Sequence, residues 1–186
     1  MKTTFVFDTE TTGLIENRII KLDKQPDVIE FFGCDVDLDT GEVSNKLNLL
    51  IKPRKPLPTE PAWGEKKTIT EITGITNEML NDAPHFKDVA DVIFSRIENA
   101  SEVVAHNAHF DQEMLNIEAE RLQRVIKWPP VICSIEQTMH LKGKRLSLTA
   151  LHEFLFKEKF ADAHRAEHDV LALARCCTEL RKRGII

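Results

Sequence analysis

The sequence predicts an α/β fold in which helices flank a mixed β-sheet. Near the N-terminus, three segments carry the β-branched and aromatic residues typical of strands. The rest of the chain alternates short apolar segments with stretches whose apolar residues recur every three or four positions, the period of an amphipathic helix. With 186 residues, of which 42% are hydrophobic, the chain is long enough for one well-packed domain, and we expect residues 1–186 to form it.

The N-terminal strands are predicted to form an antiparallel meander. The first runs from Thr3 to Asp8 and ends at a polar cluster. Strands over 28–36 and 43–51 flank a Thr-Gly turn at 39–42. Residues 52–63 hold four prolines, which predicts a surface connection without regular structure.

Strands and helices are predicted to alternate in the remaining sequence. Apolar spacing predicts helices over 86–97, over about 110–122, over 147–156 with Ser147 as N-cap, and at the C-terminus through 170–180. The short strands expected between these helices are 103–105 and 131–133. Three antiparallel strands followed by this alternation complete the mixed sheet.

Composition restricts the classes of function. The net charge of -5 argues against a protein that coats long duplex nucleic acid, but an acidic site loaded with divalent cations keeps a nuclease possible. No apolar run approaches the roughly 18 residues of a membrane span, and the N-terminal one is too short for a signal peptide. The four cysteines form no CxxC pair, which predicts buried free thiols. We expect an intracellular, cytoplasmic protein.

Asp8 and Glu10 are the first candidates for chemistry. They lie two positions apart, so a strand projects both side chains from the same face. Two like charges at the end of a buried strand are costly unless a divalent cation compensates them, and oxygen ligands favour Mg²⁺ or Mn²⁺ over zinc. The bland alternative is a polar strand end with a turn glycine.

Two later clusters add carboxylates and histidines. Asp111 ends the segment AHNAHFD, near the predicted start of a helix, where an acidic residue can also serve only the helix dipole. His164 and Asp169 belong to HRAEHD. On one continuous helix, positions five apart point about 140° away from each other, so these two side chains converge only if His164 lies in the preceding loop.

Together, FDTETTG, AHNAHFD and HRAEHD resemble the three motifs of the DEDDh exonuclease family. ITEITGIT, residues 69–76, is similar to a segment of its proofreading branch, which is DNA polymerase III epsilon-like. The resemblance runs from Thr4 to Leu180. It implies an RNase H-like sheet and a metal-dependent 3′–5′ exonuclease that releases 5′-mononucleotides.

The resemblance also implies a role for each motif residue. Asp8, Glu10 and Asp169 would bind one of two Mg²⁺ or Mn²⁺ ions. Asp8 would bridge to the second ion, which Asp111 completes directly or through water. His164 would be the general base of the hydrolysis, a role that its ordinary pKa near 6.5 suits. A sister group has tyrosine at this position, and this chain contains no tyrosine, so the histidine subtype is expected.

The expected substrate is the 3′ end of a single-stranded nucleic acid, with DNA favoured over RNA because of the ITGIT segment. Candidate substrate contacts are Thr11, Leu14, His106 and Asn107, of which Leu14 is placed to pack against the terminal base. His106 and His109 are expected to be partly buried and hydrogen-bonded. Basic residues that could guide the strand are Lys52, Arg54, Lys55, Lys66, Lys67, Lys142, Lys144 and Arg145.

Two features depart from the family pattern. Residues 16–25 look like an insertion and predict a loop at the rim of the site, to which the sequence assigns no role. Proofreading subunits carry a further C-terminal segment for the polymerase, whereas this sequence stops six residues after Leu180. A free-standing enzyme is therefore favoured over one associated with a polymerase.

Three alternatives stay open. His164 to His168 also matches HxxEH, an inverted zinc-protease motif, but Glu179 is the only carboxylate left downstream of Asp169 and the reading leaves Asp8 unexplained. The chain could be an RNA 3′–5′ exoribonuclease of the same family. It could also be a non-catalytic nucleic-acid-binding scaffold, although all five catalytic positions are filled.

Overall fold

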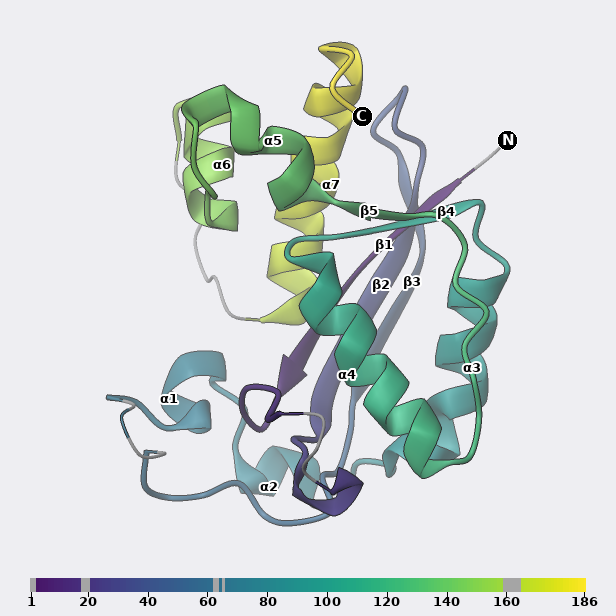
Figure 1. The fold of residues 1–186 in the computed structure, drawn as a ribbon, viewed down its shortest axis with the longest axis vertical. Coiled ribbons are helices and arrows are strands. Elements are labelled where there is room, and N and C mark those ends of the chain that lie inside the picture. The colour runs from purple at the N-terminus through teal and green to yellow at the C-terminus, as the bar shows by residue number, and fades with distance from the viewer. Residues whose placement is uncertain (1–2, 18–20, 62–63, 65, 159–164) are drawn as a thin grey trace.

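A five-stranded sheet in the order β3-β2-β1-β4-β5 forms the centre of the computed structural model (Figure 1). The structure describes residues 3–17, 21–61, 64, 66–158 and 165–186. Strands β1 (Thr4–Thr11), β2 (Val28–Val36) and β3 (Val43–Leu50) are antiparallel, whereas β4 (Glu102–Ala105) and β5 (Val131–Cys133) run parallel to β1. The predicted mixed sheet is confirmed.

Helices cover both faces of this sheet (Figure 1). The described helices are η1 (Leu22–Lys24), α1 (Ile69–Thr73), α2 (Asn77–Leu80), α3 (Phe86–Glu98), α4 (Ala108–Arg121), α5 (Ser134–Lys142), α6 (Leu148–Phe156) and α7 (Ala166–Lys182). α3 and α4 pack on one face, and α6 and α7 pack on the other. Among the described residues, none of these helices has the length and apolar character needed to cross a membrane.

Strand β1 separates the two cores by the alternation of its side chains. Phe5 and Phe7 face α3 and α4, where their rings stack 6.2 Å apart between centroids, and Phe7 stacks on Phe31 at 6.0 Å. Val6 faces α6 and α7 instead. Because side chains alternate along a strand, this pattern puts Asp8 and Glu10 on the α7 face of the sheet.

The first strand is longer than predicted. It does not end at Asp8 but continues to Thr11, because β2 pairs with it along its whole length, up to Thr11 opposite Val28. Asp8 and Glu10 therefore lie within a hydrogen-bonded strand. Such a backbone fixes the direction of their side chains more firmly than the predicted strand end would.

Other elements agree with the sequence prediction or were missed by it. The Ser147 hydroxyl accepts a hydrogen bond from the Ala150 N–H at 3.2 Å, which confirms the predicted N-cap. The four cysteines are buried free thiols, as predicted. The sequence did not predict α1, α2 or α5. α1 and α2 are only one turn long, and in α5 the buried side chains are confined to its first half.

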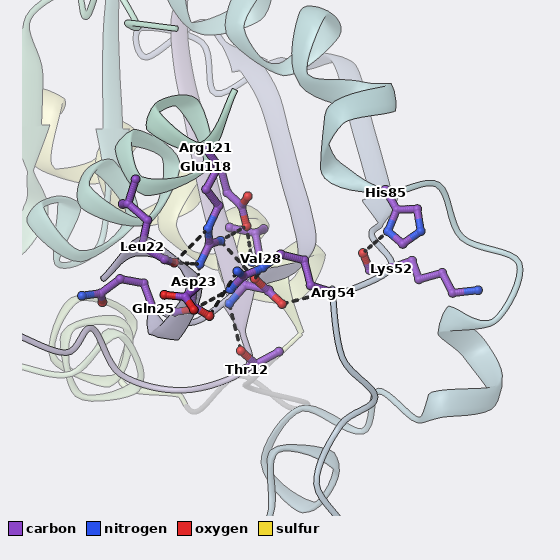
Figure 2. Close-up of polar contacts among 11 residues, drawn as sticks. Thr12, Leu22, Asp23, Gln25, Val28, Lys52, Arg54, His85, Glu118 and Arg121 are labelled. Atoms are coloured by element: carbon purple, nitrogen blue, oxygen red, sulfur yellow. Dashed lines mark hydrogen bonds and ion pairs between the residues drawn. The ribbon is translucent and has the colours of Figure 1, made fainter. Parts of the chain in front are cut away.

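The predicted rim loop, residues 16–25, is held at its base by side chains from distant parts of the chain (Figure 2). The Gln25 side chain accepts from the Glu16 N–H at 3.0 Å and donates back to the Glu16 carbonyl at 3.2 Å. Arg121, near the end of α4, donates to the carbonyl oxygens of Leu22 and Gln25 at 2.9 and 2.7 Å. The described part of the insertion is thus anchored to α4.

Candidate active site

Asp8, Glu10 and Asp169 come together on the α7 face of the sheet. Each offers a carboxylate oxygen, and these three atoms lie within 4.8 Å of one another. In the described ranges, no other set of three or more acidic, histidine or cysteine side chains gathers this closely. β1 supplies two of the carboxylates, and the first turn of α7, which packs over β1, supplies the third.

The electrostatics of this cluster call for a cation. Burial raises the pKa of Glu10 to about 8, and the charges of Asp169, Glu30 and Asp111 add to that effect. Burial and the Asp111 carboxylate hold the pKa of Asp8 well above its usual range. Carboxylates this crowded are ionised together only when positive charge is brought among them. The oxygen-only donor set suits a hard divalent cation.

Asp111 reaches β1 from the other side of the sheet. Its side chain is buried in the first turn of α4, and its Oδ1 accepts from the Thr9 N–H at 3.1 Å and from the Thr9 hydroxyl at 2.7 Å. Burial raises the pKa of Asp111 to about 7, although the bonds from Thr9 oppose that shift. Asp111 lies close enough to raise the pKa of Asp8 but outside the cluster of three.

His164 lies outside the described residues, so the structure neither supports nor opposes its predicted role. The helix that follows it begins at Ala166, with Arg165 as an extended N-cap residue. Asp169 lies in the first turn of this helix. The HxxEH alternative needs His164 and His168 one turn apart on one helix, and the first of these residues lies outside the described ranges too.

Two predicted substrate contacts lie just beyond Glu10. The Thr11 hydroxyl is buried and donates to the Gly13 carbonyl at 2.8 Å, so it stabilises the turn after β1. Leu14 follows this turn with 73% of its surface exposed. A large apolar side chain presented to solvent beside a polar cluster is available to a ligand.

The other two predicted contacts, His106 and Asn107, lie at the junction of β4 and α4. Both His106 ring nitrogens have protein partners, the Ser134 hydroxyl at 2.8 Å and the Leu146 carbonyl at 3.1 Å. Burial lowers the pKa of His106 to about 4, so the ring is neutral near pH 7. Asn107 is the N-cap of α4 in a left-handed conformation (φ 72°), and its side-chain oxygen accepts from Arg145 at 2.8 Å.

His106 and His109 differ more than predicted. His106 is partly buried, as expected, whereas His109 is exposed and its Nε2 lies 2.9 Å from the Glu136 carboxylate. The expectation of a partly buried ring is wrong for His109 because this position of α4 turns away from the sheet. Two of the proposed guiding cations are also engaged: Arg54 pairs with Asp27 at 2.6 Å, and Lys52 donates to the Asn81 carbonyl at 2.7 Å.

Sequence reasoning missed a further buried carboxylate beside the cluster of three. Glu30 of β2 is fully buried and stands opposite Glu10 in the strand register. Its partner is Arg165, whose Nη2 lies 2.8 Å from the Glu30 carboxylate. The available signal was an acidic residue between apolar neighbours in the strand VIEFFGCDV, because a buried carboxylate requires a partner.

The fold and the carboxylate cluster define a nuclease, a hydrolase of phosphodiester bonds. A family model described as exonuclease matches residues 5–177. The chain belongs to this exonuclease family, and the resemblance of its three motifs to the DEDDh family agrees with that assignment.

Similar proteins agree with this assignment. Over 175 residues the chain is 31% identical to the DNA polymerase III subunit epsilon of Buchnera aphidicola subsp. Acyrthosiphon pisum, covering 91% of this chain and 67% of that protein. It is 34% identical to the PolC-type DNA polymerase III of Bacillus subtilis over 190 residues, covering 97% of this chain but only 12% of that much longer protein.

Solved structures share the fold. Exonuclease X in complex with 5′ overhanging duplex DNA superposes with a TM-score of 0.66 at 24% identity, covering 97% of this chain and 93% of that one. The nuclease domain of 3′hExo, a DEDDh family member bound to rAMP, superposes with a TM-score of 0.73 at 17% identity, covering 98% and 93%. The predicted RNase H-like fold is confirmed.

Proposed function

We propose that this chain releases 5′-mononucleotides from the 3′ ends of single-stranded or frayed DNA, and that residues 1–186 form a single domain for this purpose. The observation that carries the proposal is the convergence of Asp8, Glu10 and Asp169 within 4.8 Å on a sheet of the exonuclease family. Three crowded, partly buried carboxylates on one face have little structural use without a cation.

Two Mg²⁺ or Mn²⁺ ions are the proposed cofactors. Asp8, Glu10 and Asp169 would hold one ion, and Asp8 together with Asp111 would hold the other. When bound, such a pair of ions lowers the pKa of the attacking water and stabilises the charge that develops on the phosphate. The raised pKa values of Glu10 and Asp111 support this arrangement, because bound cations favour the ionised form of carboxyl groups whose burial disfavours it.

His164 is the proposed general base. It would accept a proton on a ring nitrogen from the attacking water, whose oxygen forms a new bond to the phosphorus of the terminal nucleotide. The bond between this phosphorus and the 3′ oxygen of the shortened strand breaks, and that oxygen takes up a proton. The assignment is supported by the position of His164 in the sequence, directly before Arg165, which is the N-cap residue of α7. Thr11 and Leu14 would contact the terminal nucleotide, as would Asn107. The neutral, doubly hydrogen-bonded His106 would support Asn107 from the adjoining position.

We predict that His164→Ala loses most of its hydrolysis rate while it keeps its affinity for Mn²⁺. The side chain would move a proton without serving as a ligand, so turnover and metal binding should separate. Both are measured on the same preparation, by mononucleotide release and by calorimetry. A fully active His164→Ala protein would contradict the base assignment.

The preference for DNA rests on the segment Ile69–Thr76 and on the similarity to subunits named for DNA polymerase III. The second candidate is RNA, which the bound rAMP of one structural neighbour favours. Hydrolysis of matched single-stranded DNA and RNA oligonucleotides with Mg²⁺ or Mn²⁺ tests the choice. Faster digestion of RNA would reverse the preference, and absence of mononucleotide release from both would favour a binding scaffold.

A further inference from the structure

Glu30 is a carboxylate that the proposed chemistry does not use. It is completely buried on β2, directly opposite Glu10 on β1, and its charge raises the pKa values of Asp8 and Glu10. A buried carboxylate is costly, and this one adds repulsion to an already acidic cluster. The position would be more stable with an apolar residue unless the charge serves something nearby.

Within the described part of the chain, the side-chain hydrogen bonds of Glu30 all reach the start of α7. Arg165 places its Nη2 2.8 Å from Oε1 and its Nε 3.3 Å from each of the two carboxylate oxygens. The N–H of Ala166, the first residue of α7, donates to Oε2 at 3.0 Å. Glu30 therefore accepts from a backbone N–H that has no partner within the helix, and its charge complements the helix dipole. It does so from β2, 136 residues away in sequence.

The start of α7 determines where Asp169 lies. Asp169 is in the first turn, and its own N–H donates to the Arg165 carbonyl at 3.0 Å. The same helical turn therefore contains Ala166, which Glu30 binds, and Asp169, which completes the carboxylate cluster. If the first turn of α7 shifted on β2, Asp169 would move relative to the carboxylates of β1.

We propose that Glu30 is a positioning residue of the metal site, which fixes the first turn of α7 on β2 so that Asp169 meets Asp8 and Glu10. This inference rests on the proposed function. Partners of this kind, which hold a ligand without touching the ion, change metal affinity or activity about 10- to 100-fold when they are removed. Arg165 has a double task, because it neutralises Glu30 and also lowers the pKa of Glu10.

Glu118 provides a matched control. It is also almost buried, with 5% of its surface exposed, and it also combines a backbone N–H and an arginine, accepting from Val28 at 3.2 Å and Arg121 at 2.9 Å. These contacts join α4 to the beginning of β2 and none involves α7. Glu118→Gln should therefore lose stability as Glu30→Gln does, but without the effect on metal binding.

The test measures Mn²⁺ affinity by calorimetry, kcat and KM on a single-stranded oligonucleotide, and Tm, for wild type, Glu30→Gln and Glu118→Gln. We expect Glu30→Gln to weaken Mn²⁺ binding and to lower kcat by about tenfold or more, with KM nearly unchanged. Glu118→Gln should lower Tm and leave the Mn²⁺ affinity and kcat at their wild-type values. Wild-type Mn²⁺ affinity in Glu30→Gln, or losses in both variants that merely follow Tm, would overturn the proposal.

A second variant covers the case in which Glu30→Gln does not fold. Arg165→Lys keeps the charge that compensates Glu30 but lacks the forked geometry of guanidinium, and it should weaken Mn²⁺ binding in the same direction. Unaltered affinity in Arg165→Lys would also overturn the proposal. A wild-type protein that neither binds Mn²⁺ nor releases mononucleotides would instead overturn the proposed function, and this inference with it.

Discussion

Asp8 and Glu10 share a face because β1 holds them in register with β2, with Asp8 opposite Phe32 and Glu10 opposite Glu30. Their Cα–Cβ bonds cannot turn to opposite faces of the sheet without breaking that pairing. Their mutual repulsion is therefore built into the folded chain. This repulsion is relieved when either carboxylate is removed or when a cation binds.

Asp8→Ala should abolish mononucleotide release and leave the metal-free fold intact or more stable. The substitution removes the carboxylate proposed to contact both ions and relieves its repulsion with Asp111, Glu10 and Asp169. Tm measured with and without Mn²⁺ checks this, because the increase in Tm that we expect Mn²⁺ to give in wild type should be absent from the variant. A lower Tm for metal-free Asp8→Ala than for metal-free wild type would indicate that Asp8 has a structural role instead.

Leu14→Ala should lower turnover several-fold with little change in stability. The side chain is 73% exposed, and substitutions at such surface positions change the free energy of unfolding by about 0.5 kcal/mol or less. Steady-state kinetics on a single-stranded oligonucleotide, together with urea denaturation, separate the two effects. Val125→Ala, at a position that is 86% exposed and is assigned no contact, serves as the control.

At the level of single residues, the sequence could predict Asp8 and Glu10, because a strand period of two is local information. It could also predict Asp111 and Asp169, since each motif supplies one carboxylate at a helix start. It could not predict that Glu30 pairs with Arg165, because that contact joins residues 135 positions apart. No local period relates such residues, and only the folded sheet brings β2 under the start of α7.

At the level of elements, the long strands and helices followed from their periodicity, whereas short elements depended on tertiary contacts. Thr68 is the N-cap of α1 and forms a capping box with Glu71, yet the helix has only five residues. α2 has four. Helices this short carry too few apolar positions to show a period, and they persist because Ile75 and Leu80 pack with Ile29 in a small core.

Among the described residues, Arg121 of α4 is one of two arginines that donate to backbone carbonyls of the insertion, and Arg54 is the other. The Arg121 side chain is 11% exposed and forms ion pairs with Asp27 at 3.0 Å and Glu118 at 2.9 Å besides its bonds to the loop carbonyls. We expect Arg121→Met to cost about 3 kcal/mol of stability, because it leaves two poorly solvated carboxylates with fewer partners. Urea denaturation measures the loss.

Arg124→Met is the matched control for that substitution. Its partner Asp91 is 92% exposed in the side chain, and exposed ion pairs contribute about 0–1 kcal/mol. Equal losses of stability in the two variants would show that the loop carbonyls and buried carboxylates contribute nothing beyond a surface pair.

At the scale of the whole molecule, the acidic cluster sets how stability depends on pH. Glu10 has an ordinary pKa of 4.5 in the unfolded chain and a pKa of about 8 in the folded one, so the folded state binds more protons between these values. Without metal, stability should therefore be greatest below about pH 4.5 for this group and fall as pH rises to about 8. One carboxyl contributes a slope of at most about 1.4 kcal/mol per pH unit.

Urea denaturation in EDTA at several pH values between 5 and 8 measures this slope. Mg²⁺ or Mn²⁺ added at pH 8 should restore the lost stability, and Glu10→Gln should make the profile flatter. A metal-free protein whose stability rises with pH across this range would contradict the electrostatic account of the site.

Strand β4 ends at Ala105, while its neighbour β1 continues to Thr11. The Thr9 N–H is thereby left for Asp111 instead of for a sheet partner. An insertion that lengthened β4 would compete for that amide and displace the whole of α4. We therefore expect added residues to be tolerated in the loop at 16–25 but not at the β4–α4 junction. Only the length of that junction determines where Asp111 lies.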